Sequence, residues 1–264
     1  MSEIVAGVDI GSTTAKCVVL GEDAQLLGKS LSVVGVDIVQ DAERALEAAL
    51  TEARIPRSEV GFITGTGYGR YKVYFGQLVV TEISCHARGA NFLFPGTRLV
   101  VDIGGQDTKA IRINEKGEVV DFAMNDKCAA GTGRFLDVCA NALGYDVGQI
   151  GPLSLQARHA VKVTSTCTVF AESEVTSYVA RGKDPKDILA GLHASIVNRT
   201  LSLMQRVGVE PEITFTGGVS QNEGMVSALR HRLGAPVNVS PMSQYLGALG
   251  AVLHGRERLH GGAG

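Results

Sequence analysis

Two aspartates, each just ahead of a glycine turn, are the residues of this 264-residue chain whose pattern could bind phosphate. The stretch Val8–Lys16 reads VDIGSTTAK, and Val101–Lys109 reads VDIGGQDTK, 93 positions further on. Glycine in a tight turn lets backbone amides face phosphate oxygens, and serine or threonine adds hydroxyl donors. The repeat therefore predicts two similar half-domains, each with a phosphate-binding loop between two strands.

Asp9 and Asp102 end the predicted strands that lead into the two loops. Carboxylates that face phosphates are repelled unless a cation lies between them, and Mg²⁺, usually bound through water, is the natural candidate. Lys16 or Lys109 could add further positive charge. We therefore expect Asp9 and Asp102 to be catalytic residues that hold Mg²⁺ beside the phosphates.

A third glycine cluster, Phe215–Val219, follows a predicted apolar strand. Gly217 and Gly218 could lie flat under an adenine or a ribose, because neither carries a side chain. One Asp-x-Gly turn is weak support for a function, but two aligned copies followed by this cluster favour a nucleotide site. The sequence contains no Gly-x4-Gly-Lys-Ser/Thr motif, so a P-loop is excluded.

Two of the five cysteines, Cys128 and Cys167, lie at or near the amino termini of predicted helices. Such positions favour a thiolate or a negatively charged metal–sulfur cluster. Because a cubane cluster takes four thiolates, two cysteines from each subunit of a symmetric dimer would complete the set. The alternative is that both are buried structural thiols, which is our interpretation of Cys17, Cys85 and Cys139.

The elements that must position these residues follow from hydrophobic periodicity and turn signals. We expect one half-domain over residues 1–95, completed by a helix in 241–264, and the other over 96–240. The expected strands and helices are a hairpin over 4–20, a helix over 41–54, a strand over 60–64, a helix over 82–94, a loop and helix over 125–143, a strand over 161–164, helices over 170–179 and 187–207, a strand over 213–215, and helices over 224–233 and 245–253.

The composition narrows the class of protein. Charged residues make up 20% of the chain and the formal net charge is −2, so no basic surface indicates nucleic acid. No apolar run approaches the roughly 20 residues of a membrane span. Residues 1–4 lack the basic start and long apolar run of a signal peptide. We therefore expect a cytoplasmic protein that binds neither nucleic acid nor membrane.

The order of the motifs, with two phosphate loops and then an adenosine glycine pair, resembles the actin, heat-shock chaperone and sugar kinase superfamily. The resemblance spans nearly the whole chain. It implies an α/β actin-like ATPase fold, made of two ribonuclease H-like lobes with ATP or ADP in the cleft. The fold by itself does not choose among the activities of that superfamily.

Residues 125–137 and 165–175 are similar to activator components of 2-hydroxyacyl-CoA dehydratases, a family that includes ATPase subunits of benzoyl-CoA reductases. Further matching stretches are Gly11–Thr13, Thr66–Arg70, Asp102–Asp107, Thr216–Val219 and Gly247–Ala251. The resemblance implies an oxygen-sensitive homodimer in which Cys128 and Cys167 of both subunits hold one [4Fe–4S] cluster. It implies ATP-driven transfer of a low-potential electron to a partner iron–sulfur dehydratase or reductase, with ferredoxin or flavodoxin as donor.

The expected nucleotide site draws on all of these motifs. Gln106 is our candidate for orienting the attacking water, by analogy with other NTPases that use a glutamine. The alternative is that Gln106 only binds phosphate. The expected nucleotide-binding residues are Gly11, Ser12, Thr13, Thr14, Ala15, Lys16, Gly104, Gly105, Gln106, Gly131, Thr132, Gly133, Gly217, Gly218 and Gln244.

Three other functions remain open at this point. The first is an ATPase subunit held permanently in a benzoyl-CoA reductase complex. The second is a small-molecule kinase of the same superfamily, which needs a substrate-binding carboxylate for which the sequence offers no obvious motif. The third is a nucleotide-gated, chaperone-like binding module in which the thiols are incidental.

Overall fold

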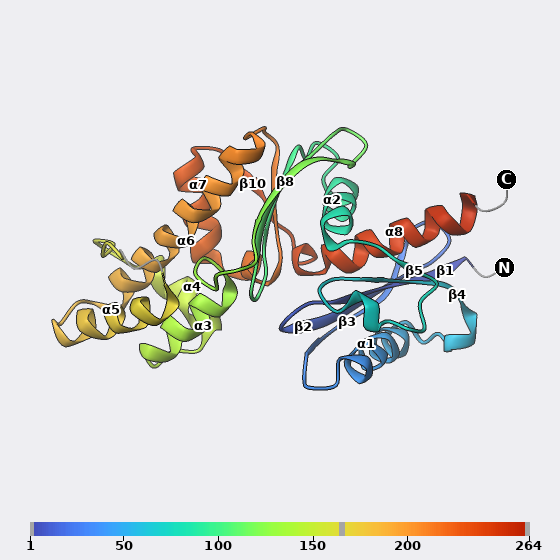
Figure 1. Ribbon diagram of the computed structural model, residues 1–264, viewed down its shortest axis with the longest axis horizontal. Coiled ribbons are helices and arrows are strands. Elements are labelled where there is room, and N and C mark those ends of the chain that lie inside the picture. Colours follow the sequence, from blue (N-terminus) through green and yellow to red (C-terminus); the bar gives the residue numbers. More distant parts are fainter. Residues whose placement is uncertain (1–2, 164–166, 262–264) are drawn as a thin grey trace. The chain divides into compact units, whose positions relative to one another are not determined.

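A computed structural model describes residues 3–163 and 167–261 of the chain (Figure 1). The chain divides into two compact units. Unit 1 comprises Met1–Gly96, Asn114–Val119 and Tyr245–Gly264, and unit 2 comprises Thr97–Ile113 and Val120–Gln244. Each unit is built around its own five-stranded sheet with helices packed against it.

In unit 1 the strand order is β3-β2-β1-β4-β5, with β2 antiparallel to β1 and β3, and β4 parallel to β1 and β5. Buried β-branched residues fill β1 and β2, which is why these segments form central strands. The elements of unit 1 are β1 (Ile4–Ile10), β2 (Thr14–Leu20), β3 (Leu26–Val33), α1 (Ile38–Ala53), η1 (Arg57–Glu59), β4 (Val60–Thr66), η2 (Arg70–Lys72), β5 (Leu78–Val79), α2 (Glu82–Leu93) and α8 (Leu246–Gly261).

The two faces of this sheet are covered differently. Helix α1 packs on β2 and β3 through its apolar stripe, which includes Ala45, Leu46 and Ala49. Its amino end is capped by Asp37, whose side chain accepts a hydrogen bond from the Gln40 amide. Helix α8 packs on β1 and β4, on the other side of the sheet from α1, and α2 packs on α8 (Figure 1).

Helix α8 approaches its neighbours backbone to backbone. A Cβ atom at Gly7 of β1 would clash with the carbonyl oxygen of Ala248, and one at Gly250 of α8 would clash with the carbonyl of Cys85 in α2. Gly89 of α2 faces α8 in the same way. Glycine is required at these positions because no side chain separates the elements.

Unit 2 repeats the sheet of unit 1 in the order β8-β7-β6-β9-β10. The repeat predicted from the sequence is confirmed in the register, since Asp102 lies opposite Lys109 as Asp9 lies opposite Lys16. The elements are β6 (Leu99–Ile103), β7 (Thr108–Ile113), β8 (Val119–Asn125), α3 (Gly133–Ala142), α4 (Val147–Ser154), α5 (Thr168–Ala180), α6 (Pro185–Val207), β9 (Ile213–Thr216), η3 (Gly218–Gln221), α7 (Glu223–Leu233) and β10 (Val237–Asn238), with η4 (Ser243–Tyr245) before α8.

The units differ between the third strand and the long helix that follows it. In unit 1 residues 34–37 join β3 to α1, whereas in unit 2 residues 126–184 join β8 to α6 and contain α3, α4 and α5. Phe135 of α3 is fully buried in the core of unit 2, so this insertion is part of the packed unit. Both Cys128 and Cys167 lie in it.

Two local features differ from the sequence-based expectation. Helix α4 was not predicted, although Asp146 and Gln149 form a capping box at its start. The expected strand over 161–164 is absent from its described residues 161–163, and residue 164 lies outside the described part. The amide of Val161 donates instead to the carbonyl of Asp187 in α6. Within residues 3–163 and 167–261, no helix has the length and apolar character needed to cross a membrane.

Candidate functional site

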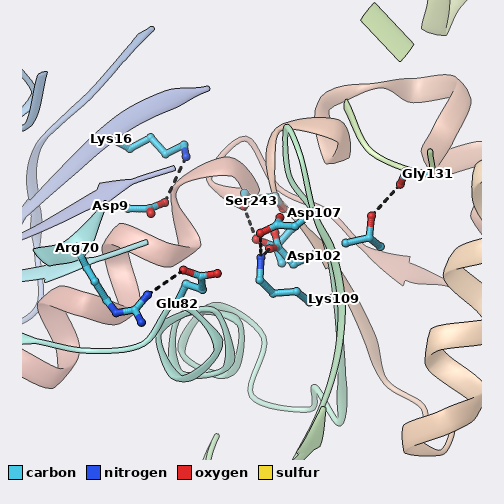
Figure 2. Close-up of polar contacts among 11 residues, drawn as sticks. Asp9, Lys16, Arg70, Glu82, Asp102, Asp107, Lys109, Gly131 and Ser243 are labelled. Carbon is cyan, nitrogen blue, oxygen red and sulfur yellow. Dashed lines mark hydrogen bonds and ion pairs between the residues drawn. The ribbon is translucent and has the colours of Figure 1, made fainter. Parts of the chain in front are cut away.

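The first predicted phosphate loop is a tight turn between β1 and β2. The Gly11 amide donates to the Thr14 carbonyl over 3.0 Å, which closes the turn. Asp9 and Lys16 face each other across the strand pair, and the Lys16 Nζ lies 3.3 Å from the Asp9 Oδ2 (Figure 2). Both side chains are buried, whereas Gly11–Thr14 remains partly exposed, so the loop is open to a ligand.

The second loop repeats this geometry with one added charge. The Gly104 amide donates to the Asp107 carbonyl over 3.0 Å. The Lys109 ammonium lies 3.1 Å from Asp102 and 2.7 Å from Asp107, so one buried lysine is shared by two carboxylates (Figure 2). Asp107, which occupies the position of Thr14 in the first copy, was missed as a site residue, although the aligned repeat contained that signal.

In both loops a lysine is the cation that the structure places beside the strand-end aspartate. Such a buried pair needs its partner, because a buried carboxylate without one is costly. The lysine therefore supplies part of the charge compensation that was expected from Mg²⁺. Gln106 is exposed at the tip of the second loop, where its side chain is accessible to solvent.

A threonine–glycine pair ends the strand next to each aspartate. Thr66 of β4 lies beside Asp9, and Thr216 of β9 lies beside Asp102, both in parallel register. Gly67 and Gly217 then take positive φ angles of 88° and 85°. A Cβ at Gly217 would lie 2.6 Å from the Asp102 Oδ1, and one at Gly67 would clash with Asp9. Each aspartate thus packs against a glycine at a position that leaves no room for a side chain.

A cavity of about 730 Å³ in unit 2 is lined by residues that follow the Gly217-Gly218 pair in the chain, from Ser220 onward. The Thr216 hydroxyl donates to the carbonyl of Ser243, the residue before Gln244, over 2.7 Å. A Cβ built on Gly218 would have no heavy atom of the described structure within 4 Å, so a flat group has room there. The cavity is lined by Ser220, Gln221, Glu223, Val226, Ser227, Arg230, His231, Val239, Ser240 and Pro241.

The second loop also holds the start of α3. The Gly133 amide donates to the Gly104 carbonyl over 2.9 Å, and the Arg134 amide donates to the Gly105 carbonyl over 2.8 Å. The Thr108 hydroxyl donates to the Gly131 carbonyl over 2.7 Å (Figure 2). The structure therefore brings the predicted residues Gly131, Thr132 and Gly133 to the predicted phosphate loop.

The cysteines fall into two groups. Cys17, Cys85 and Cys139 are buried, as expected for packed thiols, and burial raises the pKa of the last two to about 12. Cys128 is exposed, and Cys167 is half-buried as the N-cap of α5. Within the described residues, no three His, Cys, Asp or Glu side chains form a group that could hold a metal.

The chain matches the BadF/BadG/BcrA/BcrD ATPase family over residues 6–255. It is 44% identical to the (R)-2-hydroxyglutaryl-CoA dehydratase activating ATPase of Acidaminococcus fermentans, over 96% of this chain and 97% of that protein. It is 35% identical to a benzoyl-CoA reductase subunit of Thauera aromatica, over 97% of this chain and 94% of that protein.

Solved structures give the same fold. The crystal structure of the A. fermentans (R)-2-hydroxyglutaryl-CoA dehydratase component A has a TM-score of 0.95 and 42% identity, with 98% of this chain and all of that chain covered. A ROK family glucokinase from Streptomyces griseus has a TM-score of 0.61 at 16% identity, over 96% of this chain and 99% of that chain, a likeness of fold alone. The predicted α/β fold of actin-like ATPases and sugar kinases is confirmed.

Proposed function

Since this chain belongs to the BadF/BadG/BcrA/BcrD ATPase family, we propose that it is an ATP-hydrolysing iron–sulfur activator of a 2-hydroxyacyl-CoA dehydratase-type enzyme. In this proposal it passes a low-potential electron from a ferredoxin or flavodoxin to that partner. One observation carries the proposal: the two cysteines outside the buried group lie in the insertion of unit 2, and that insertion is hydrogen-bonded to a phosphate loop.

The nucleotide is proposed to bind through backbone amides and hydroxyls of the two loops. The turns Gly11–Thr14 and Gly104–Asp107 support this, because their residues are at least partly exposed while Asp9 and Asp102 behind them are buried. We place the adenosine at Gly217 and Gly218, because a Cβ at Gly218 would meet open space and a cavity is lined by the residues from Ser220 onward. Gln244 is retained as a further contact.

Hydrolysis is proposed to use Gln106 to orient the attacking water, with Mg²⁺ held through water by Asp9 and Asp102. The exposure of Gln106 at the loop tip suits that role. The paired lysines leave each aspartate able to accept hydrogen bonds from such waters. Replacing Gln106 with Ala should slow hydrolysis without changing ADP affinity, and an unchanged rate would exclude the role.

Cys128 and Cys167 fit as ligands of a [4Fe–4S] cluster. They are the accessible thiols among the five, and Cys167 caps the start of α5, where free amides and the helix dipole stabilise negative charge. When bound, the cluster supplies a one-electron carrier whose potential depends on charge, hydrogen bonds to sulfur and solvent exposure. Two thiolates per chain require a homodimer to complete the four.

The test is the iron content of the anaerobically purified protein. The wild type should be brown and contain about four irons per dimer, whereas Cys128→Ala and Cys167→Ala should be nearly iron-free. The matched control is Cys139→Ala, which removes a thiol of the same unit that the proposal does not use. Full iron and sulfide content in either ligand variant would refute the assignment.

A second candidate function is that of an ATPase subunit in a benzoyl-CoA reductase complex, because one of the relatives carries that name. Such a chain would be part of a permanent assembly with different chains. The mass of the protein purified from its native host separates the two cases. A free homodimer supports the activator, and a stable complex with other chains supports the reductase component.

A further inference from the structure

The hydrogen bonds between the second phosphate loop and α3 involve particular peptide groups. The Gly104 carbonyl, which accepts from Gly133, belongs to the same planar peptide as the Gly105 amide. The Gly105 carbonyl, which accepts from Arg134, shares its plane with the Gln106 amide. An amide and a carbonyl on one rigid plane turn together. Any ligand that orients the Gly105 and Gln106 amides must therefore also orient the carbonyls that hold α3.

A side chain reinforces this connection next to the cysteine. Thr108, the first residue of β7, is buried and donates from its hydroxyl to the Gly131 carbonyl. Gly131 has a positive φ angle of 94°, so its carbonyl direction is set by an unusual backbone conformation. The position of Thr108 in the first copy of the repeat is Ala15, which has no hydroxyl. The first hairpin therefore cannot form this contact, which belongs to unit 2, the unit that contains the exposed Cys128.

The segment around Cys128 is held together by its own polar contacts. The Asn125 side-chain amide donates to the Cys128 carbonyl over 2.8 Å and to the Ala130 carbonyl over 3.3 Å. The Thr132 hydroxyl donates to the Ala129 carbonyl over 2.6 Å. A segment closed on itself in this way moves as one body, so a displacement of Gly131 is passed on to Cys128.

We propose that Thr108 is a positioning residue through which the occupancy of the loop at 104–107 sets the placement of Cys128. The inference rests on the proposed function for the nucleotide site and does not require the cluster to be present. Phosphate at the loop fixes the two peptide planes, these planes fix the start of α3, and the Thr108 hydroxyl holds Gly131 to the same strand end. Loss of the hydroxyl weakens the coupling of Cys128 to the loop, while the backbone bonds of α3 and phosphate binding remain.

The experiment measures alkylation of Cys128 by iodoacetamide in the metal-free protein, with and without ADP or a non-hydrolysable ATP analogue. Mass spectrometry of peptides separates Cys128 from Cys167. The three buried cysteines react slowly, because burial raises their pKa values. In the wild type we expect nucleotide to change the alkylation rate of Cys128 at least about fivefold, the lower range of allosteric coupling.

The variants are chosen to separate coupling from folding. Thr108→Val removes the hydroxyl at nearly constant volume, and Thr108→Ala provides a second variant that matches Ala15 of the other hairpin. Both should move the ratio of rates with and without nucleotide clearly towards one, while Thr108→Ser should restore the wild-type ratio. Thr200→Val is the matched control, since Thr200 is also a buried hydroxyl that donates to a carbonyl, that of Ile196 within α6. It should keep the wild-type ratio.

The outcomes decide between the two proposals. A full nucleotide response in Thr108→Val and Thr108→Ala, or none in the wild type, would overturn the positioning role. Calorimetric titration with ADP must show that these variants still bind, and loss of binding would place Thr108 in the nucleotide site instead. A wild-type protein that never contains iron would refute the activator proposal, yet it would leave the alkylation ratios and their interpretation unchanged.

Discussion

Units 1 and 2 contain the same hairpin, but different segments follow it. Both place a buried aspartate opposite a buried lysine, and both cover the aspartate with a glycine of positive φ. In unit 1 the third strand then leads into α1 after four residues, 34–37. In unit 2 the insertion at 126–184 brings α3 onto the loop itself. A duplicated hairpin can thus keep its geometry while one copy carries a further segment that is hydrogen-bonded to it.

The loops themselves differ where the insertion meets them. Position 14 of the first copy is threonine and the matching position 107 is aspartate, which takes a second share of the lysine. Position 15 is alanine and the matching position 108 is the threonine that holds Gly131. Of these two differences, the one at 107 adds an ion pair within the loop and the one at 108 adds a hydrogen bond to the added segment.

The largest expected effect distinguishes the two lysines. Lys109→Met takes the shared buried ammonium away from two carboxylates and should cost about 3–5 kcal/mol of the free energy of unfolding. Lys16→Met removes a single, longer ion pair of a more exposed lysine, 11% against 3%, and should cost less. Urea denaturation of both variants measures the difference. Adding Asp102→Asn should recover part of the loss in Lys109→Met, and equal losses at the two lysines would contradict the asymmetry.

The next effect compares adjacent glycines in unit 2. Gly217→Ala forces a Cβ against Asp102 at a positive φ and should destabilise the protein by about 2–4 kcal/mol. Gly67→Ala, its equivalent in unit 1, should do the same. Gly218→Ala enters open space and should change stability by less than about 0.5 kcal/mol, yet it should weaken ADP binding if the adenosine lies against Gly218.

Thermal unfolding and ADP titration of the three glycine variants check these expectations. A destabilised Gly218→Ala would show that the backbone there is less tolerant than its surroundings indicate. An unchanged ADP affinity in a stable Gly218→Ala protein would move the proposed adenosine position elsewhere in unit 2. A well-folded Gly67→Ala beside an unfolded Gly217→Ala would mean that the two hairpins are not energetically equivalent.

The smallest effect is a pH dependence confined to unit 2. Burial lowers the pKa of His193 in α6 to about 4, and its Nδ1 lies 3.0 Å from the Ser154 hydroxyl. Below the unfolded pKa of about 6.5 the unfolded chain binds a proton that the folded chain refuses, so stability falls as pH drops. The loss from this group should reach about 2 kcal/mol at pH 5.

The measurement is the free energy of unfolding at pH 7 and pH 5 for the wild type and His193→Gln. The variant is expected to be less stable at neutral pH, because it disturbs the contact with Ser154, but to lose less on acidification. An identical pH dependence in both proteins would show that His193 is protonated in the folded state. That outcome would contradict its burial as a neutral ring.

The sequence predicts those features whose signal is local. The hairpins at Asp9 and Asp102 and the helix over 41–54 follow from contiguous patterns, and the structure has them. The equivalence of Thr66-Gly67 with Thr216-Gly217 was missed because the insertion changes the spacing of the repeat from 93 to 150 residues. A repeat search at one fixed offset cannot find a pair displaced by inserted helices.

Other features depend on contacts between segments that are far apart in the sequence. Helix α3 is attached to the second loop through the backbone amides of Gly133 and Arg134, and no residue type predicts these hydrogen bonds. The second partner of Lys109 depends on the register and turn that bring Asp107 back towards β7. Residues 161–163 have the composition of a strand but meet α6, and tertiary contact decides their structure.

The glycine contacts of α8 restrict how this part of the molecule can vary. Protein cores usually tolerate compensating substitutions, in which one side chain is replaced by a larger one and its neighbour by a smaller one. Gly7, Gly89 and Gly250 face main-chain carbonyls, and a carbonyl cannot shrink. No compensating substitution exists for them, so a saturation library at these three positions should return glycine alone. The same constraint applies at Gly247, because a Cβ atom there would clash with the carboxylate of Asp9. Because these glycines cannot be replaced, the packing next to Asp9 cannot change through substitutions there.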